Sequence, residues 1–263
     1  MSDLRHDGVV RAEVDGGVAV VTLNRPDQRN ALNREIQAAI PRVLSELDAA
    51  DDVDAIVLTG ADPAFCAGVD LKELGSGAGG DSAGLVLPKD QRGPFPSHST
   101  PIIGAVNGVA ITGGLEVALA CDFLVASDRA RFADTHARVG VMPGWGLTVL
   151  LPQAVGIRRA REMSITGNFV DADTALAWGL VNHVVPHDEL LGFARQLAAD
   201  VVGVPRDGVR RMLQTYHETA DVTLAEGWQI EATVSREWLA GGLDSAEVEA
   251  RRQAIVDRGR TQL

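Results

Sequence analysis

The stretch that most constrains the fold lies between residues 101 and 122 and runs PIIGAVNGVAITGGLEVALACD. It predicts a buried strand that passes through a glycine turn, Gly113 and Gly114, into a helix with Glu116 in its first turn. A carboxylate between such apolar flanks costs free energy unless something uses it, and free N–H groups at a helix start favour negative charge. The segment therefore indicates an acid/base group beside an anion site. The alternative is a carboxylate that only complements the helix dipole.

A second loop of small residues lies at 61–72, after a predicted buried strand at 54–59. Small residues let a ligand approach the backbone, where N–H groups can point at an oxygen. On this segment alone, an ordinary glycine turn explains the pattern as well. Two such turns, each after a buried strand, match two donors that converge on one oxyanion. Each donor of this kind stabilises a transition state by about 3 kcal/mol.

The composition restricts the class of protein. With 263 residues, the chain fits one large domain or one domain with a small appendage. The net charge of −12 argues against non-specific nucleic-acid binding. Two cysteines are too few for a disulfide framework and too sparse for a metal cluster. No apolar run approaches the roughly 20 residues of a membrane span, and the start lacks a signal peptide, so we expect a cytoplasmic protein with no membrane contact.

The remaining pattern predicts an α/β core with a helical C-terminal module. Residues 9–24 form a predicted hairpin, and a helix with one apolar face follows, which Pro41 should kink or interrupt. Strands and helices alternate from 101 to 186, which is typical of a parallel sheet. Residues 75–99 are rich in glycine and proline and indicate a flexible loop, and after Pro186 the pattern is helical.

Five segments, in order, resemble the enoyl-CoA hydratase/isomerase (crotonase) superfamily, and within it enoyl-CoA hydratase most. Leu23–Leu32 resembles the segment beside the CoA adenine pocket, and Phe65–Leu71 and Ala105–Asp122 resemble the two oxyanion loops. Val141–Gly146 and Asp171–Asn182 match further signatures of the family. Any one match can arise by chance, but five in the right order over nearly the whole chain are highly specific.

The resemblance implies a spiral of ββα units over residues 1–200 and a helical trimerisation region over 201–263. It implies homotrimers, which often pair into hexamers. It also implies an acyl-CoA thioester substrate, with the carbonyl oxygen between the backbone N–H groups of Val69 and Gly113. We expect no metal and no separate cofactor, since coenzyme A is part of the substrate.

The resemblance also implies a set of substrate contacts. Lys72, one of only two lysines, is the first candidate to bind a CoA phosphate, and Arg25 and Arg29 are weaker ones. The acyl chain is expected near the 75–99 loop and Met142–Trp145. The other predicted contact residues are Ala31, Ala67, Gly68, Asp70, Leu71, Gly114, Pro143, Gly144 and Trp145.

One position departs from the hydratase pattern. Hydratases of this family use two glutamates to position water; Glu116 occupies the first position, and His136 falls at the second. Histidine titrates near pH 6.5, so it can act as an acid, and a neighbouring carboxylate favours its protonated form. His136 as the proton donor to a Glu116 base, and His136 as a polar wall residue, both stay open. Asp134 is a weaker substitute, because a two-residue shift changes the direction of the side chain.

These features favour a hydratase-like lyase that adds water across the 2,3 double bond of an enoyl-CoA. The replaced second glutamate keeps another crotonase reaction open, namely isomerisation, decarboxylation or thioester hydrolysis. An acyl-CoA-binding protein without turnover, with the glycine turns kept for affinity, is the alternative from another class.

Overall fold

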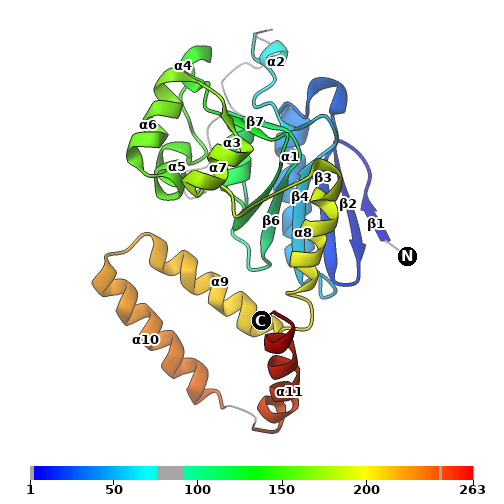
Figure 1. Ribbon diagram of the computed structural model, residues 1–263, viewed down its shortest axis with the longest axis vertical. Coiled ribbons are helices and arrows are strands. Elements are labelled where there is room, and N and C mark those ends of the chain that lie inside the picture. The colour runs from blue at the N-terminus through cyan, green and yellow to red at the C-terminus, as the bar shows by residue number, and fades with distance from the viewer. Residues whose placement is uncertain (1–2, 76–91, 243–244, 263) are drawn as a thin grey trace. The chain divides into compact units, whose positions relative to one another are not determined.

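A spiral of strands and helices organises the chain (Figure 1). The structure is a computed structural model that describes residues 3–75, 92–242 and 245–262. It divides into two units, one up to Arg210 and one from Arg211 onward. The first unit contains two sheets, and the predicted α/β character of this part is confirmed.

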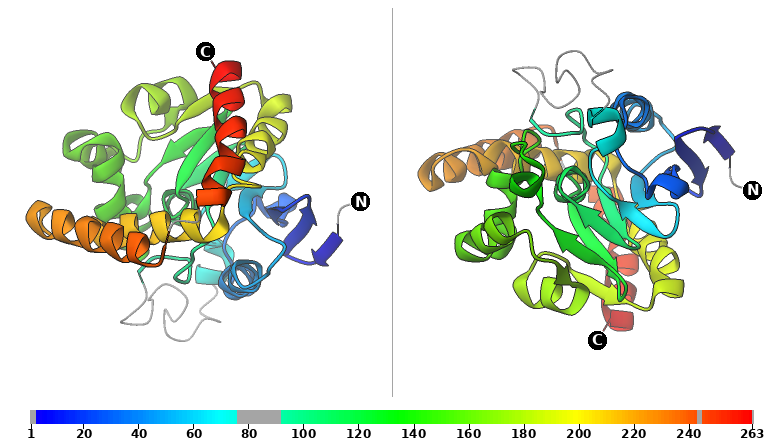
Figure 2. Two further views of the ribbon diagram at one scale, coloured as in Figure 1. Left: turned by 90° about the horizontal axis from the view of Figure 1, so that it is seen from below. Right: turned by 90° about the horizontal axis from the view of Figure 1, so that it is seen from above.

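Within the described residues, the larger sheet has seven strands, with β1 and β11 at its two edges. Figure 2 shows the structure from two further sides, with β1 next to the N-terminus. Pairing among β1, β2 and β3 is antiparallel, which confirms the predicted hairpin, and the pairing from β3 to β11 is parallel. In spatial order the strands are β1 (Asp3–His6), β2 (Val10–Asp15), β3 (Val18–Leu23), β4 (Ala55–Gly60), β6 (Ile102–Val106), β8 (Phe123–Ser127) and β11 (His183–Val185).

The smaller sheet has four short strands, parallel except for its edge strand β10. Its order is β10 (Val170–Asp171), β9 (Arg131–Ala133), β7 (Val109–Ile111) and β5 (Ala64–Cys66). The strand β5 is a difference from the sequence prediction, which placed Phe65 and Cys66 in a loop. Its three residues are fully buried and pair with β7, so partners distant in sequence make this short run a strand.

Three successive turns of the chain repeat one pattern: a strand in the larger sheet, a strand in the smaller sheet, and then a helix. The first turn is β4, β5 and α2 (Leu71–Gly75); the second is β6, β7 and α3 (Gly113–Leu119); the third is β8, β9 and α4 (His136–Val139). Each helix therefore begins where a strand of the smaller sheet has ended. This confirms the ββα spiral implied by the family resemblance.

The larger sheet is covered on both faces, which explains why its central strands are continuously apolar. All six residues of β4 are buried. Alternate residues Ala55 and Val57 pack with α8 (Leu190–Ala199), while Ile56 and Leu58 belong to the core on the other face. That second core includes the apolar face of α1 (Arg34–Asp48).

The other helices of the first unit follow α4 along the chain. They are α5 (Leu147–Val155), α6 (Ile157–Thr166) and α7 (Ala172–Trp178), and single turns of 3₁₀ helix occupy Pro26–Gln28 and His187–Glu189. The predicted alternation between residues 101 and 186 is thus confirmed.

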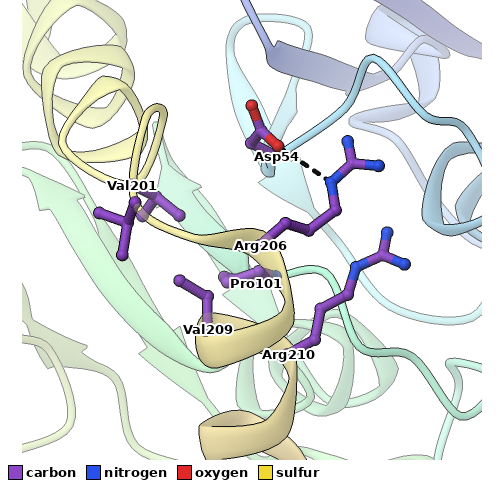
Figure 3. Close-up of a pocket in the computed structure, with 7 residues that line it drawn as sticks. Asp54, Pro101, Val201, Arg206, Val209 and Arg210 are labelled. Atoms are coloured by element: carbon purple, nitrogen blue, oxygen red, sulfur yellow. Dashed lines mark hydrogen bonds and ion pairs between the residues drawn. The ribbon is translucent and has the colours of Figure 1, made fainter. Parts of the chain in front are cut away.

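The helix α9 (Arg206–Ala220) begins within the first unit. Arg206 donates from Nε to Asp54 Oδ1 at 3.1 Å (Figure 3), and Arg210 donates to Thr100 Oγ1 at 3.1 Å. The two arginines line a small pocket with apolar neighbours Pro101, Val201, Val204 and Val209. These bonds hold residues up to 210 on the core, in agreement with the division between the units after Arg210. The expected domain boundary at 200 stays a prediction.

The second unit is helical, as the sequence predicted. Besides the rest of α9 it contains α10 (Leu224–Ala240) and α11 (Ser245–Gln262). A capping box starts α10, with Thr223 and Glu226 bonded to each other's backbone N–H. Within the described residues, no helix of either unit is both long enough and apolar enough to cross a membrane.

Pro41 lies inside α1, and the helix does not end there. The predicted end of a helix segment at Pro41 is therefore wrong, and the alternative, a kink, stays a prediction. Asn33 caps the helix by accepting a hydrogen bond from Ile36 N at 3.0 Å, and Ile36, Ile40, Val43, Leu44 and Leu47 are buried on one side. This burial outweighs the roughly 3 kcal/mol that an internal proline costs a helix.

We expect Pro41→Ala to raise the free energy of unfolding by about 1–3 kcal/mol, because alanine restores the missing N–H donor. Chemical denaturation monitored by circular dichroism measures the change. Ala38→Pro, three residues earlier in the same helix, is the matched control and should lower the free energy of unfolding. A lower stability for Pro41→Ala would mean that the ring of Pro41 contributes packing that outweighs the lost hydrogen bond.

Candidate active site

Three loops of the site follow three neighbouring strands. The strands β5, β7 and β9 are parallel, with Cys66 paired to Ala110 and Ile111 paired to Ala133. Their carboxyl ends therefore lie side by side at one edge of the smaller sheet. The loops that continue them hold residues 67–69, 112–113 and 134–136, so the topology brings together all three predicted parts of the site.

The backbone of Val69 is oriented by its neighbour Leu32. Leu32 N donates to Gly68 O at 2.8 Å, and Asp70 N donates to Leu32 O at 3.2 Å, which forms a single parallel bridge. In this register the bonds go to the residues on either side of Val69, so the N–H of Val69 points away from Leu32. Within the described residues, that N–H donates no hydrogen bond and is available to a ligand.

Gly113 supplies the second N–H. It is the first residue of α3, so the helix itself offers its amide no acceptor. A methyl group built on Gly113 would lie 3.9 Å from Val69 N, and one built on Gly68 would lie 3.5 Å from Gly113 N. The two amides thus border the same small space, as the donors of an oxyanion hole must.

Gly68 and Gly114 permit this close approach. Gly68 has a φ of +85°, and a Cβ there would lie 2.6 Å from Ile111 O. A Cβ on Gly114 would lie 2.1 Å from Cys66 O. Real Cβ atoms do not come this near to backbone oxygens, so both positions require glycine.

Thr112, the residue before Gly113, was missed by sequence reasoning. It has a φ of +56° and a ψ of −115°, which is strained for a β-branched residue. Its N–H donates to Ala133 O at 2.9 Å, and its hydroxyl accepts from Thr135 N at 3.1 Å and lies 2.6 Å from Thr135 Oγ1. These bonds hold the strained turn and link the loops after β7 and β9. No sequence signal indicates such a backbone at a threonine.

Glu116 lies in the first turn of α3, as predicted, and its side chain is 3% exposed. Its Oε1 accepts hydrogen bonds from Trp145 N at 2.8 Å and Leu147 N at 3.3 Å. The carboxylate is therefore held by backbone amides at the start of α5 rather than by its own helix, so it does more than complement the helix dipole. The second oxygen, Oε2, faces His136.

His136 joins Glu116 and Asp134 in a buried chain of three ionisable groups. Its Nε2 lies 3.5 Å from Glu116 Oε2, and its Nδ1 lies 2.6 Å from Asp134 Oδ1. Burial opposes the charge on the ring, but the hydrogen bond to Asp134 and the nearby Glu116 carboxyl group prevail and raise the pKa of His136 to about 9. Burial also opposes the charge on Asp134, yet the hydrogen bonds from His136 and Ser164 hold the pKa of that carboxyl below its usual value.

The arrangement can hold an anion at two amides and exchange protons close by. At neutral pH the His136 ring is protonated and can donate a proton, and the Glu116 carboxyl group beside it can accept one. Asp134 contacts Nδ1 of His136 and Glu116 contacts Nε2, so the ring lies between the two carboxyl groups. From the sequence, Asp134 is predicted only as a weaker substitute for the second glutamate, and an aspartate two residues before the histidine, after a strand, is the available signal for its contact with the ring.

The predicted CoA contacts fall into two groups. Arg25 and Asp70 pair with each other at 3.0 Å, Arg25 also donates to Ala31 O, and Asp70 Oδ1 accepts from Lys72 N at 3.1 Å. These bonds join the 25–32 segment to the first oxyanion loop and give both side chains a structural role. Their contact with CoA stays a prediction.

Some of the other predicted contacts are exposed to solvent, and some are buried. Arg29, Leu71 and Lys72 are exposed, and Lys72 lies in the first turn of α2. Ala67 is half-buried, with its N–H bonded to Arg29 O at 3.0 Å, and Ala31 is buried.

The loop before α5 carries the contacts predicted for the acyl chain. Trp145 is 6% exposed, Pro143 is half-buried, and Gly144 and Met142 are exposed. Most of the predicted 75–99 acyl-chain loop, residues 76–91, lies outside the described residues.

A family model described as enoyl-CoA hydratase/isomerase matches residues 13–246. The chain belongs to this family. Its sequence is 35% identical over 247 residues to a probable peroxisomal enoyl-CoA hydratase of Arabidopsis thaliana, covering 93% of this chain and 91% of that protein. It is 36% identical to a short-chain-enoyl-CoA hydratase of Clostridium acetobutylicum, covering 84% of this chain and 86% of that protein.

Solved structures agree with this family membership. The structure of an enoyl-CoA hydratase from Mycobacterium tuberculosis H37Rv has a TM-score of 0.74 at 46% identity, covering 87% of this chain and 98% of that one. An enoyl-CoA hydratase subunit from Geobacillus kaustophilus HTA426 has a TM-score of 0.80 at 32% identity, covering 95% and 96%. These matches confirm the crotonase-like fold.

Two neighbouring glycines of the site should respond differently to alanine. A Cβ on Gly114 meets backbone atoms of Cys66, so we expect Gly114→Ala to lower the free energy of unfolding by about 1–3 kcal/mol or more. A Cβ on Gly113 meets the flexible tip of Leu32 at 3.1 Å and borders the anion space, so Gly113→Ala should lower activity much more than stability. Thermal unfolding and crotonyl-CoA kinetics of both variants separate the effects. Equal stability losses in the two variants would contradict this assignment.

Proposed function

We propose that the protein is an enoyl-CoA hydratase that adds water across the 2,3 double bond of an enoyl-CoA thioester. The observation that carries the proposal is the buried Glu116–His136 pair, 3.5 Å apart, beside the converging amides of Val69 and Gly113. The relatives named as enoyl-CoA hydratases over most of the chain support it.

The two amides polarise the thioester. The carbonyl oxygen accepts hydrogen bonds from Val69 N and Gly113 N, and the negative charge that develops on this oxygen as the enolate forms strengthens both bonds. Each such donor contributes about 3 kcal/mol, because the amides are already oriented when the charge appears. The strain at Thr112 is part of the backbone geometry that orients Gly113.

Glu116 activates the water, and His136 supplies the proton for the α-carbon. Glu116 accepts a proton from water as the water oxygen bonds to the β-carbon, and the π electrons of the double bond move toward the carbonyl oxygen. The enolate then takes a proton at the α-carbon from Nε2 of His136. Glu116 is left protonated and His136 neutral, and the proton passes back between them across the 3.5 Å gap, so the pair ends as it began.

His136 at the second glutamate position is also the observation that favours a second candidate. Reactions of this superfamily diverge at such positions while the oxyanion hole is kept, so double-bond isomerisation, decarboxylation or thioester hydrolysis of an acyl-CoA is the alternative. Binding without turnover has less support, because a protein that only binds gains nothing from a buried pair poised for proton transfer.

The remaining expectations follow from the family. We infer an acyl-CoA substrate bound without a separate cofactor, in a cytoplasmic homotrimer or dimer of trimers. Exposed apolar side chains on the helical second unit support self-association, among them Leu224 (82% exposed) and Trp228 (67% exposed).

The hydration proposal is tested with crotonyl-CoA and a substrate panel. We expect wild-type turnover to a product heavier by one water, and a fall in kcat of about 10²–10⁴-fold in Glu116→Gln, because the amide cannot accept the proton from water. Product mass separates hydration from isomerisation, which leaves the mass unchanged. Wild-type turnover no higher than that of Glu116→Gln would refute the role of the carboxylate.

The role of His136 predicts a pH profile. Hydration needs the protonated ring, and the pKa of His136 is about 9, so kcat/KM should be constant at neutral pH and fall as pH rises through about 9. His136→Ala should lose roughly 10²-fold or more in rate together with this alkaline limb. His136→Glu, which introduces the second glutamate of the hydratase pattern, should retain or raise hydration. Equal rates in wild type and His136→Ala would make His136 a wall residue.

Lys72 is proposed to bind a CoA phosphate. Lys72→Ala should raise the KM for crotonyl-CoA several-fold with little change in kcat, because an exposed ion pair adds binding energy of up to about 1 kcal/mol. Added salt should raise the wild-type KM and affect the variant less. Arg29→Ala, tested in parallel, shows whether the weaker candidate contributes, and an unchanged KM in Lys72→Ala would exclude this contact.

A further inference from the structure

One oxygen of Asp134 holds both the ring and the backbone of His136. Asp134 Oδ1 lies 2.6 Å from His136 Nδ1 and accepts from His136 N at 3.1 Å. Asp134 is 1% exposed and His136 is 5% exposed, so water competes little for these bonds. The contact between His136 and Glu116, at 3.5 Å, is longer than an ordinary N–H···O hydrogen bond. The ring is therefore fixed from the Asp134 side and open toward Glu116.

This contact decides which ring nitrogen exchanges protons. A carboxylate accepts hydrogen bonds, so Nδ1 keeps its proton against Asp134 in both the neutral and the charged ring. The proton that comes and goes must then be on Nε2, the atom that faces Glu116 Oε2. Proton transfer is thereby directed into the space beside the oxyanion amides.

The charged groups around the ring come from separate elements. Glu116 faces it from α3, Asp134 from the end of β9, and Ser164 of α6 completes the surroundings of Asp134 with a hydrogen bond. Burial opposes the charge on the ring, but an imidazolium between two carboxylates is still favoured over a neutral ring. The raised pKa of His136, with Asp134 the first of its favourable causes, agrees with that geometry.

We propose that Asp134 is a positioning residue for the hydration reaction, which keeps His136 charged and aims its Nε2–H at the substrate. The proposal rests on the proposed function of the Glu116–His136 site and deepens it. It explains how a histidine can donate a proton at this position: the Asp134 carboxylate stabilises the protonated ring.

If the role of Asp134 were only structural, it would be to hold the local turn by accepting the hydrogen bond from His136 N. The variant Asp134→Asn separates the two roles, because an asparagine Oδ1 still accepts from a backbone N–H but carries no charge. The matched control is Asp48→Asn. Asp48 Oδ1 also accepts backbone bonds, from Ser99 N at 3.0 Å and Thr100 N at 2.7 Å, but lies near the start of β6 instead of at the site.

The experiment combines kinetics with a direct titration of the ring. Crotonyl-CoA hydration is measured from pH 6 to 10 for wild type, Asp134→Asn and Asp48→Asn, with thermal unfolding as a check of folding. The six histidines are labelled with ¹⁵N, and the His136 signal is assigned as the one missing from His136→Gln. Its titration reports the pKa of His136 without any substrate.

We expect Asp134→Asn to lower the pKa of His136 by about one unit or more and to move the alkaline limb of kcat/KM down with it. At neutral pH, kcat should fall roughly 10- to 100-fold with the KM changed less than about twofold, as for other residues that orient a catalytic group. Asp48→Asn should lose stability without moving either titration.

An unchanged pKa of His136 in a folded Asp134→Asn protein would overturn the proposal, as would an equal shift in Asp48→Asn. A lowered pKa together with no hydration by wild type would support the Asp134 assignment and refute the hydratase proposal instead. The two failures are thus distinguishable.

Discussion

Parallel pairing among β5, β7 and β9 is the constraint on which the site depends. These strands are only three residues long, yet each must end beside its neighbours for the amides of Val69 and Gly113 to border one space. The glycines at 68 and 114 and the strained backbone of Thr112 are the local consequences, since they let two strand ends and a helix start come within contact distance. The larger sheet supplies the burial that makes such short strands stable.

The buried charges are arranged so that each has a partner. Glu116 is held by two backbone amides, His136 lies between two carboxylates, and Asp134 receives bonds from the ring, the backbone and Ser164. A buried ion without partners costs several kcal/mol, so removing any one member leaves the others exposed to that penalty. The contacts that place these groups for proton transfer thus also make the stability of the site sensitive to substitution.

Much of this architecture could be predicted from the sequence because it rests on local patterns. The hairpin, the alternation of strands and helices, the helical C-terminal part and the position of Glu116 each follow from apolar periodicity and glycine turns. A helix end at Pro41 does not form, because the buried face of α1 outweighs a local helix breaker, and β5 is not predicted because its pairing with β7 makes it a strand.

The parts of the site that sequence could not supply depend on contacts between distant segments. The register that frees Val69 N is set by Leu32, 37 residues earlier in the numbering, and Glu116 is held by amides of Trp145 and Leu147. The link between Thr112 and Thr135 joins two loops, and neither residue type signals it. The contribution of Asp134 required knowing which way its carboxylate turns.

The two groups proposed to bind the anion, Val69 N and Gly113 N, are both main-chain amides. A backbone N–H is present whichever side chain a codon specifies, so ordinary point mutations at Val69 leave the donor in place. Substitutions of the side chains around it, such as that of His136, act on the proton-transfer groups instead. Such a scaffold can explore new reactions over evolutionary time while it retains the ability to hold a thioester oxygen.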